Sequence, residues 1–118
     1  MDVDERKEID GRADVHVVYG WNFSLEKVKE MLGKLKKNVY VTIDVDVFDP
    51  MFIRNTGTPE PGGLLWQDVV ECLKLIFEEK NVVGADVVEF APKVNYEAEA
   101  FALAKLVYMI CGLKSKSL

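Results

Sequence analysis

The chain has 118 residues, of which 49% are hydrophobic and 30% are charged, and its formal net charge is −5 at pH 7. This length suits one compact domain and is too short for two. The acidic balance argues against nucleic acid or an anionic membrane as the main partner, whereas a cationic ligand or a metal ion is compatible with it.

The N-terminal part of the chain is polar. Residues 1–14 form a polar segment that we expect either to be partly disordered or to begin in the middle of an element. This segment has no hydrophobic signal core, and no stretch of the chain approaches the roughly 20 apolar residues of a membrane span. The sequence therefore predicts a cytoplasmic protein, in which residues 15–118 follow the polar segment as an α/β unit.

Three strand–helix units are predicted along residues 15–118. The β-branched run 15–19 ends at Gly20 and predicts a first strand. Ser24 is a suitable N-cap for a helix, because apolar residues follow it at helical spacing. The run 39–43 predicts a second strand, apolar on both faces as in a buried parallel sheet.

The stretch between Asp44 and Gly63 has three prolines and three glycines, which predicts a long loop. Loops of this length in compact domains are usually functional or disordered. A second helix follows, with apolar side chains on one face from Trp66 to Phe77.

The run 82–88 predicts a third strand, which ends at Glu89. The last helix, at about residues 95–111, is apolar nearly all round, and we expect it to be deeply packed. Cys72 and Cys111 lie in different predicted helices without a CxxC spacing, which predicts two buried, reduced thiols.

Strands that alternate with helices predict a parallel sheet with right-handed crossovers, and ligands of such sheets bind beyond the carboxyl ends of the strands. Three acidic residues fall at those predicted ends, namely Asp44, Asp46 and Glu89. This coincidence makes the carboxyl edge of the predicted sheet the candidate functional site.

Asp44 and Asp46 are two residues apart at the end of a strand, so their side chains point to the same side. Two nearby carboxylates repel each other unless a cation lies between them, and hard oxygen ligands suit magnesium, calcium or manganese. A solvated acidic turn is the alternative. Asp49 is expected to cap the turn before Pro50, and His16 to be a core or surface residue outside the site.

Asp86 lies inside the third predicted strand and is expected to hold a loop or a neighbouring strand. An EF-hand loop fits the acidic stretch poorly, because Phe48 stands where that loop needs a polar ligand. The Asp-x-Asp pattern also resembles phosphatases of the haloacid-dehalogenase type, with Asp86 and Glu89 as a later acidic pair. An Asp-x-Asp metal-dependent phosphohydrolase is therefore an alternative enzyme class.

Two longer motifs carry a closer resemblance. The segment Asp44-Val-Asp-Val-Phe-Asp-Pro50, with the later run Thr56-Gly-Thr-Pro-Glu-Pro-Gly-Gly63, resembles the signature of the ureohydrolases, the family of arginase, agmatinase and formiminoglutamase. The segment Gly84-Ala-Asp-Val-Val-Glu-Phe-Ala-Pro92 resembles that family's guanidinium-binding strand end. The Pro-Glu-Pro-Gly-Gly run is most like agmatinases. Thr42 stands where the family usually has Ser, and Arg54-Asn55 where it usually has Pro-Gly or Pro-Ala.

The resemblance implies a three-layer αβα fold with a parallel sheet, of which this chain supplies only the C-terminal part, about three strand–helix units. It also implies two manganese ions, with Asp44 bridging both and Asp46 ligating one. Glu89 would bind the guanidinium of a small guanidino molecule, and Thr58 would help to line that pocket. The implied reaction is hydrolysis of a guanidino C–N bond, which releases urea.

Most of the family's metal ligands, which are two histidines and four aspartates, are absent. They belong to a Gly-Gly-Asp-His motif and an Asp-Ala-His-x-Asp motif, and neither occurs in this sequence. We therefore expect no ureohydrolase activity from this chain alone, and we expect it to form a homo-oligomer or to need a complementing N-terminal chain. The alternative is a non-catalytic interaction or regulatory fragment of the same fold.

Overall fold

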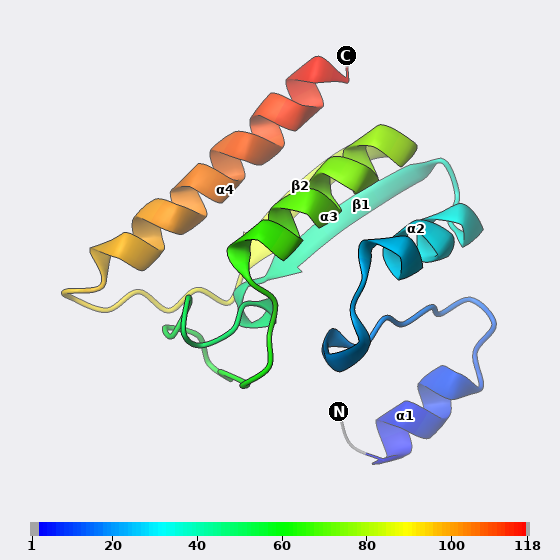
Figure 1. Cartoon of the computed structure of the whole chain (residues 1–118), viewed down its shortest axis with the longest axis horizontal. Coiled ribbons are helices and arrows are strands. Elements are labelled where there is room, and N and C mark those ends of the chain that lie inside the picture. The colour runs from blue at the N-terminus through cyan, green and yellow to red at the C-terminus, as the bar shows by residue number, and fades with distance from the viewer. Residues whose placement is uncertain (1–2, 118) are drawn as a thin grey trace.

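The computed structural model describes residues 3–117 (Figure 1). Its elements in chain order are helix α1 (Val3–Asp10), the 3₁₀ turn η1 (Gly20–Asn22), helix α2 (Leu25–Lys34), strand β1 (Asn38–Asp44), the 3₁₀ turn η2 (Val45–Val47), helix α3 (Trp66–Glu79), strand β2 (Asn81–Val88) and helix α4 (Glu97–Lys116).

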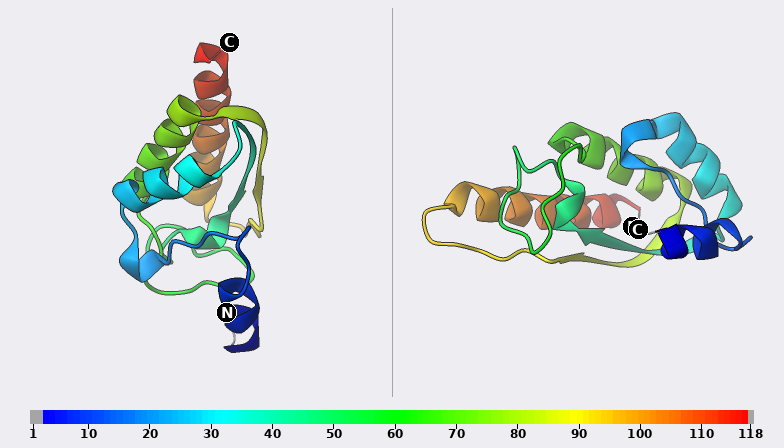
Figure 2. Two further views of the ribbon diagram at one scale, coloured as in Figure 1. Left: turned by 90° about the vertical axis from the view of Figure 1, so that its right-hand side faces the viewer. Right: turned by 90° about the horizontal axis from the view of Figure 1, so that it is seen from below.

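The two strands form a parallel sheet, as the sequence predicts. The register runs from Asn38 opposite Asn81 to Asp44 opposite Val88, with an irregularity after Val39. Helix α3 connects the strands, helices α3 and α4 contact β2 and each other, and α2 packs on α3. Figure 2 shows these helices on one side of the sheet. The α/β class with a parallel sheet is therefore confirmed.

Local interactions explain where the helices begin. Ser24 caps α2 as predicted, since its hydroxyl oxygen accepts a hydrogen bond from the backbone N–H of Lys27 at 3.3 Å. At the start of α3, the carboxylate of Asp68 accepts one from the backbone N–H of Leu65 at 3.0 Å. Each bond satisfies an N–H group that the helix itself leaves unpaired.

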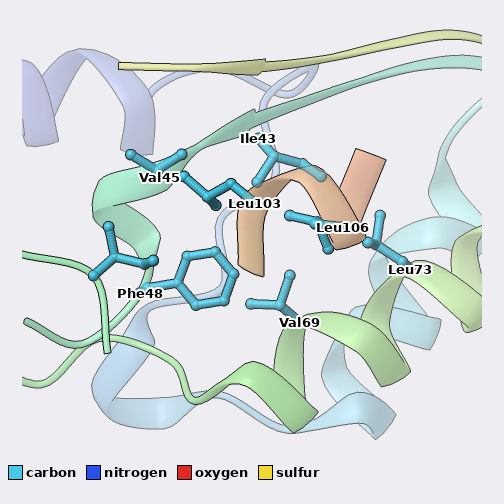
Figure 3. Packing of buried hydrophobic residues seen from close by; sticks show 8 residues of the cluster. Ile43, Val45, Phe48, Val69, Leu73, Leu103 and Leu106 are labelled. Atoms are coloured by element: carbon cyan, nitrogen blue, oxygen red, sulfur yellow. The ribbon is translucent and has the colours of Figure 1, made fainter. Parts of the chain in front are cut away.

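The main hydrophobic core lies between one face of β1 and the helices α3 and α4 (Figure 3). Three fully buried side chains of this core come from the long loop after β1, namely Val45, Phe48 and Ile53. The ring of Phe48 also stacks on that of Trp66. The loop is therefore ordered by burial of its own apolar side chains, and its acidic residues stand on a packed support.

The prediction of a first strand at residues 15–19 is wrong. No strand occurs before Asn38 in the described chain, and residues 15–19 lie in extended, unpaired backbone. This run lines a shallow cavity with Lys27 and Met31 of α2. A strand needs a hydrogen-bonded neighbour, and β1 pairs only with β2 in residues 3–117. The polar N-terminal segment contains the helix α1, whereas residues 1–2 lie outside the described part.

The second strand is not buried on both faces. Val39, Val41 and Ile43 face the helices, whereas the alternate residues are exposed, with Tyr40 exposed to 59%. The reason is that helices cover only one face of the sheet in this chain. No helix within residues 3–117 is long and apolar enough to cross a membrane.

The last helix is packed on one side only. Leu103 and Leu106 of α4 are buried, but Phe101 and Tyr108 are exposed to 76% and 81%. Cys111 is also exposed, which contradicts the prediction of two buried thiols. Both cysteines are free, and partial burial raises the pKa of Cys72.

Gly63 is required where two loop segments meet. A Cβ atom at Gly63 would lie 2.6 Å from the backbone nitrogen of Asp49 and 2.7 Å from the carbonyl oxygen of Val47. These backbone atoms cannot move freely, because both are hydrogen-bonded to Leu64, at 3.0 and 2.7 Å respectively.

We therefore expect Gly63→Ala to lower the free energy of unfolding by about 1–3 kcal/mol, the usual cost of overpacking. Urea denaturation followed by circular dichroism measures the change. Gly57→Ala is the control, because a Cβ atom there meets nothing within 4 Å. Equal urea midpoints for the two variants would contradict the steric argument.

Candidate functional site

Three predicted site residues lie at one end of the sheet. Asp44 is the last residue of β1 and pairs with Val88, the last residue of β2. Glu89 follows Val88 directly, and Asp46 lies in the turn that continues β1. The parallel pairing thus brings together residues from two distant parts of the chain, as expected for the ligand-binding edge of such a sheet.

The acidic pair is held in place by two hydrogen bonds. Asp44 Oδ1 accepts one from the backbone N–H of Asp46 at 3.1 Å. Asp46 Oδ2 accepts another from the hydroxyl of Thr58 at 2.7 Å. The backbone N–H of Thr58 in turn donates to the hydroxyl oxygen of Thr56 at 3.1 Å. The far side of the loop is therefore folded back onto the acidic pair.

Glu89 has an unusual backbone conformation. Its φ is +67°, in the left-handed region that residues other than glycine rarely adopt. The next residues are fixed, because Phe90 pairs with Thr56 and the N–H of Ala91 donates to the carbonyl of Asn55 at 2.8 Å. Such strain costs about 1–3 kcal/mol and persists only where the surroundings determine it. The exposed carboxylate of Glu89 makes no hydrogen bond or ion pair within residues 3–117.

Glu99 is a buried anchor that the sequence reading missed. Its side chain is 7% exposed, and its carboxylate accepts hydrogen bonds from the backbone N–H of Arg54 at 2.9 Å and of Asn55 at 3.2 Å. The side-chain amide of Asn55 donates a third at 2.7 Å. These donors compensate for burying a charge, and they tie the loop to α4. The feature of the sequence that indicates its burial is its position four residues before Leu103, on the buried stripe of α4.

Asp86 joins the two strands, which confirms that it holds a neighbouring strand. Its carboxylate accepts a hydrogen bond from the hydroxyl of Tyr40 at 2.9 Å and another from that of Thr42 at 2.6 Å. All three lie on the sheet face that no helix covers. The hydrogen bond to Asp86 raises the pKa of Tyr40, with smaller contributions from desolvation and from the negative charge of Asp86.

This pKa shift predicts a pH dependence at alkaline pH. Because the pKa of Tyr40 is higher in the folded chain, its bond to Asp86 stabilises the fold below the ordinary tyrosine pKa near 10. That stabilisation is lost as the pH rises through the folded-state pKa. We expect ultraviolet titration of Asp86→Asn to show one tyrosine ionising at lower pH than in the wild type. Tyr40→Phe, introduced into the wild type or into Asp86→Asn, should remove that tyrosine from the titration curve. Identical curves for Asp86→Asn and the wild type would contradict the assignment.

The carboxylate oxygens of Asp44 and Asp46 provide some of the ligands that a hard divalent cation needs. Asp44 and Asp46 open onto a cleft of about 800 Å³ that Glu8, Ile9 and Arg12 also line. Each carboxylate has one oxygen without a hydrogen bond in the described chain. Within residues 3–117, however, no group of three or more His, Cys, Asp or Glu side chains is placed to hold a metal. The two aspartates therefore amount to part of a metal site.

Two other polar residues have the expected roles outside the site. The carboxylate of Asp49 accepts hydrogen bonds from the backbone N–H groups of Met51 at 2.9 Å and Gly62 at 3.1 Å. It thus caps the turn before Pro50, as predicted. His16 lines the shallow cavity beside α2 and does not line the cleft of Asp44 and Asp46.

Comparison with known protein families gives one match, to the model described as the arginase family, over residues 11–112. Among curated relatives, an N(1)-aminopropylagmatine ureohydrolase of Thermus thermophilus is 47% identical over 85 residues, which cover 72% of this chain and 29% of the relative. An agmatinase of Halalkalibacterium halodurans is 51% identical over 83 residues, which cover 68% of this chain and 29% of the relative. The chain spans about a third of the length of the curated relatives it matches.

Solved structures agree with this result. A putative agmatinase from Clostridium difficile superposes with a TM-score of 0.83 at 28% identity, covering 98% of this chain and 42% of that one. A proclavaminate amidino hydrolase from Streptomyces clavuligerus superposes with a TM-score of 0.78 at 28% identity, covering 88% of this chain and 36% of that one. The two-stranded sheet and its helices thus match one portion of a larger fold.

Proposed function

Because this chain belongs to the arginase family, we propose that it forms the C-terminal, metal-loop part of a manganese-dependent ureohydrolase, most like the agmatinases. The reaction would hydrolyse a guanidino C–N bond and release urea. The observation that carries the proposal is the meeting of Asp44, Asp46 and Glu89 at one sheet end, with Thr58 hydrogen-bonded to Asp46. A cytoplasmic location is part of the same proposal.

Asp44 and Asp46 are the residues that would hold manganese. Their oxygen donors suit this ion, which when bound would make a water molecule acidic enough to supply a nucleophile at neutral pH. Thr58 donates to Oδ2 of Asp46 and so fixes the orientation of that carboxylate. Hydrogen bonds of this kind to a metal ligand typically affect metal affinity by roughly 10–100-fold. Thr58 would thus be a positioning residue and, as the resemblance implies, would also help to line the guanidinium pocket.

Glu89 would bind the guanidinium of the substrate. A carboxylate accepts two parallel N–H groups from the planar guanidinium, which fixes both its position and its plane. The left-handed backbone of Glu89 is held by the pairing of Phe90 with Thr56, so the backbone that carries this carboxylate is fixed at the strand end before any substrate arrives. Such preorganisation reduces the cost of orienting the substrate.

The site needs groups from outside this chain. Two carboxylates bind a divalent ion weakly, and within residues 3–117 no third His, Cys, Asp or Glu side chain is placed to hold a metal with them. We therefore propose that the chain alone is inactive and that a complementing N-terminal chain, or the same region of a longer protein, supplies the missing ligands. Self-association through surfaces left exposed here is the other form of assembly that we propose.

Co-expression with an upstream fragment bearing the two missing histidine motifs tests the catalytic proposal. We expect manganese-dependent urea release from agmatine, arginine or a related guanidino compound, and we expect Glu89→Gln to remove it. A stable complex that releases no urea from any of these compounds would favour the non-catalytic interaction fragment. Magnesium-dependent phosphatase turnover, lost in Asp44→Asn, would favour the phosphohydrolase alternative.

A further inference from the structure

Helix α4 carries a second apolar face opposite the one that packs on the core. Phe101, Ala104, Tyr108, Cys111 and Ser115, here called the outer stripe, follow one another at alternating steps of three and four residues. All five are exposed in the structure. In an α-helix this spacing places side chains along one side, as in the seam of a coiled coil.

We propose that the outer stripe pairs with the outer stripe of a second copy of this chain, with the two α4 helices antiparallel. Nothing in residues 3–117 covers the outer stripe, and its large side chains Phe101 and Tyr108 are therefore highly exposed. Helix α4 has 20 residues, which corresponds to about 30 Å of helix. That length allows the whole stripe to be covered by one partner helix.

The order of large and small side chains suits the antiparallel arrangement. Consider a pairing whose twofold axis crosses the helices at the level of Leu106, a residue that itself faces the core. Phe101 then lies opposite Cys111 of the second copy, since they stand five residues before and after that level. Ala104 and Tyr108 stand two residues before and after it, and they also face each other. Each aromatic ring thus meets a small side chain, which allows close packing, whereas a parallel pairing would place the two Tyr108 rings opposite each other.

The charges at the ends of α4 favour the same direction. Glu97 is in the first turn of the helix, and Lys114 and Lys116 are in the last. In the pairing centred on Leu106, Glu97 lies opposite Ser115 of the second copy, between those two lysines. Opposite charges are then adjacent at both ends, and the helix dipoles also point in opposite directions.

The size of the contact sets the expected strength. Four aromatic side chains, two from each copy, contribute roughly 600–1,000 Å² at about 150–250 Å² each. Specific stable interfaces bury about 1,200–2,000 Å² in total. We therefore expect a weak dimer, because this contact is smaller than that of a specific, stable complex.

A disulfide between the copies tests both the contact and its direction. In Phe101→Cys, the new thiol faces Cys111 of the second copy, so mild oxidation should give a covalent dimer on a non-reducing gel. Phe101→Ser keeps both natural cysteines, and Phe101→Cys with Cys111→Ser lacks the partner thiol, so neither control should give it. Absence of the covalent dimer in Phe101→Cys would overturn the pairing. A short bismaleimide that joins Cys111 to Cys111 in the wild type would also overturn it, because the antiparallel pairing keeps these two thiols apart.

Sedimentation gives an independent test that needs no oxidation. Tyr108→Glu should raise the dissociation constant of the dimer at least tenfold without loss of helix signal in circular dichroism, because this side chain is 81% exposed. Trp21→Glu is the matched control, since Trp21 is an aromatic residue 80% exposed and lies outside α4.

Two results would contradict the proposal. The first is a wild-type chain that stays monomeric at 200 μM, and the second is a Tyr108→Glu chain that associates as well as the wild type. If the wild type is monomeric and an upstream fragment protects Cys111 from alkylation, the stripe belongs to an interface within a longer chain.

Discussion

Replacing Asp44 with asparagine should remove manganese binding from the assembled site. Asp44 ends β1 and lines the same cleft as Asp46, and its Oδ1 already accepts the backbone N–H of Asp46. The substitution keeps the size of the side chain and one acceptor oxygen, but it removes the negative charge. Because a hard divalent ion is held mainly by charged oxygen donors, we expect the affinity to fall by more than about 100-fold, beyond the loss typical of outer-shell changes.

Calorimetry with manganese measures this change on the chain complemented with the upstream fragment. Asp49→Asn is the matched control, since Asp49 lies in the same motif but binds the backbone N–H groups of Met51 and Gly62. Asparagine retains one of those acceptors, so the control should bind manganese nearly as well as the wild type. Equal loss in both variants would mean that the motif acts by folding alone and that Asp44 is not a ligand.

The uncomplemented chain gives a second comparison. We expect weak or absent manganese binding there, because two carboxylates do not complete a site. Submicromolar binding that an Asp44→Ala/Asp46→Ala variant loses would mean that self-assembly, or other residues of this chain, complete it. That result would contradict the need for an upstream chain and leave the metal role of the two aspartates intact.

Glu99→Ala should be among the most destabilising single substitutions in the chain. The change leaves the backbone N–H groups of Arg54 and Asn55, and the side-chain amide of Asn55, without their acceptor in a buried place. Hydrogen bonds to a charged group contribute about 1.5–3 kcal/mol each, and buried unsatisfied donors add their desolvation cost. We therefore expect the free energy of unfolding to fall by about 3 kcal/mol or more.

Urea denaturation measures the loss of stability, and hydrogen exchange locates it. The amides of Arg54 and Asn55 should exchange much faster in Glu99→Ala than in the wild type, because both donate to this carboxylate. Glu97→Ala, two residues earlier in the exposed first turn of α4, is the control and should change stability by less than about 1 kcal/mol. Unchanged exchange at both amides would show that Glu99 does not anchor the loop.

The Glu99 anchor also links the fold to the proposed chemistry. It holds Asn55 in place, and the carbonyl of Asn55 accepts the N–H of Ala91 beyond Glu89. The segment between Asn55 and Thr58, which donates to Asp46, starts from the same point. We therefore expect Glu99→Ala to impair guanidinium binding and metal binding together, although Glu99 touches neither ligand.

Much of the site could be predicted from local sequence patterns. Ser24 followed by apolar residues at helical spacing determined where α2 begins, because capping and amphipathic spacing act within a few residues. The spacing of Asp44 and Asp46 predicted that their carboxylates lie together, and both line one cleft, although Asp46 lies in the turn η2 and not in the strand from which the prediction was argued. Their motifs also indicated the arginase family, which the match over residues 11–112 confirms.

The rest depended on contacts between residues far apart in the chain. Residues 15–19 have the composition of a strand, yet they remain unpaired, since the sheet within residues 3–117 consists of β1 and β2 alone. Glu99 meets Asn55, 44 positions away, and no local pattern encodes that pairing. Likewise, α4 is apolar all round in sequence, but only the packing of α3 and β2 against one side decides which face is buried and leaves Phe101 and Tyr108 exposed. Local spacing acts over a few residues, whereas strand pairing and burial require a partner that only the folded arrangement brings near.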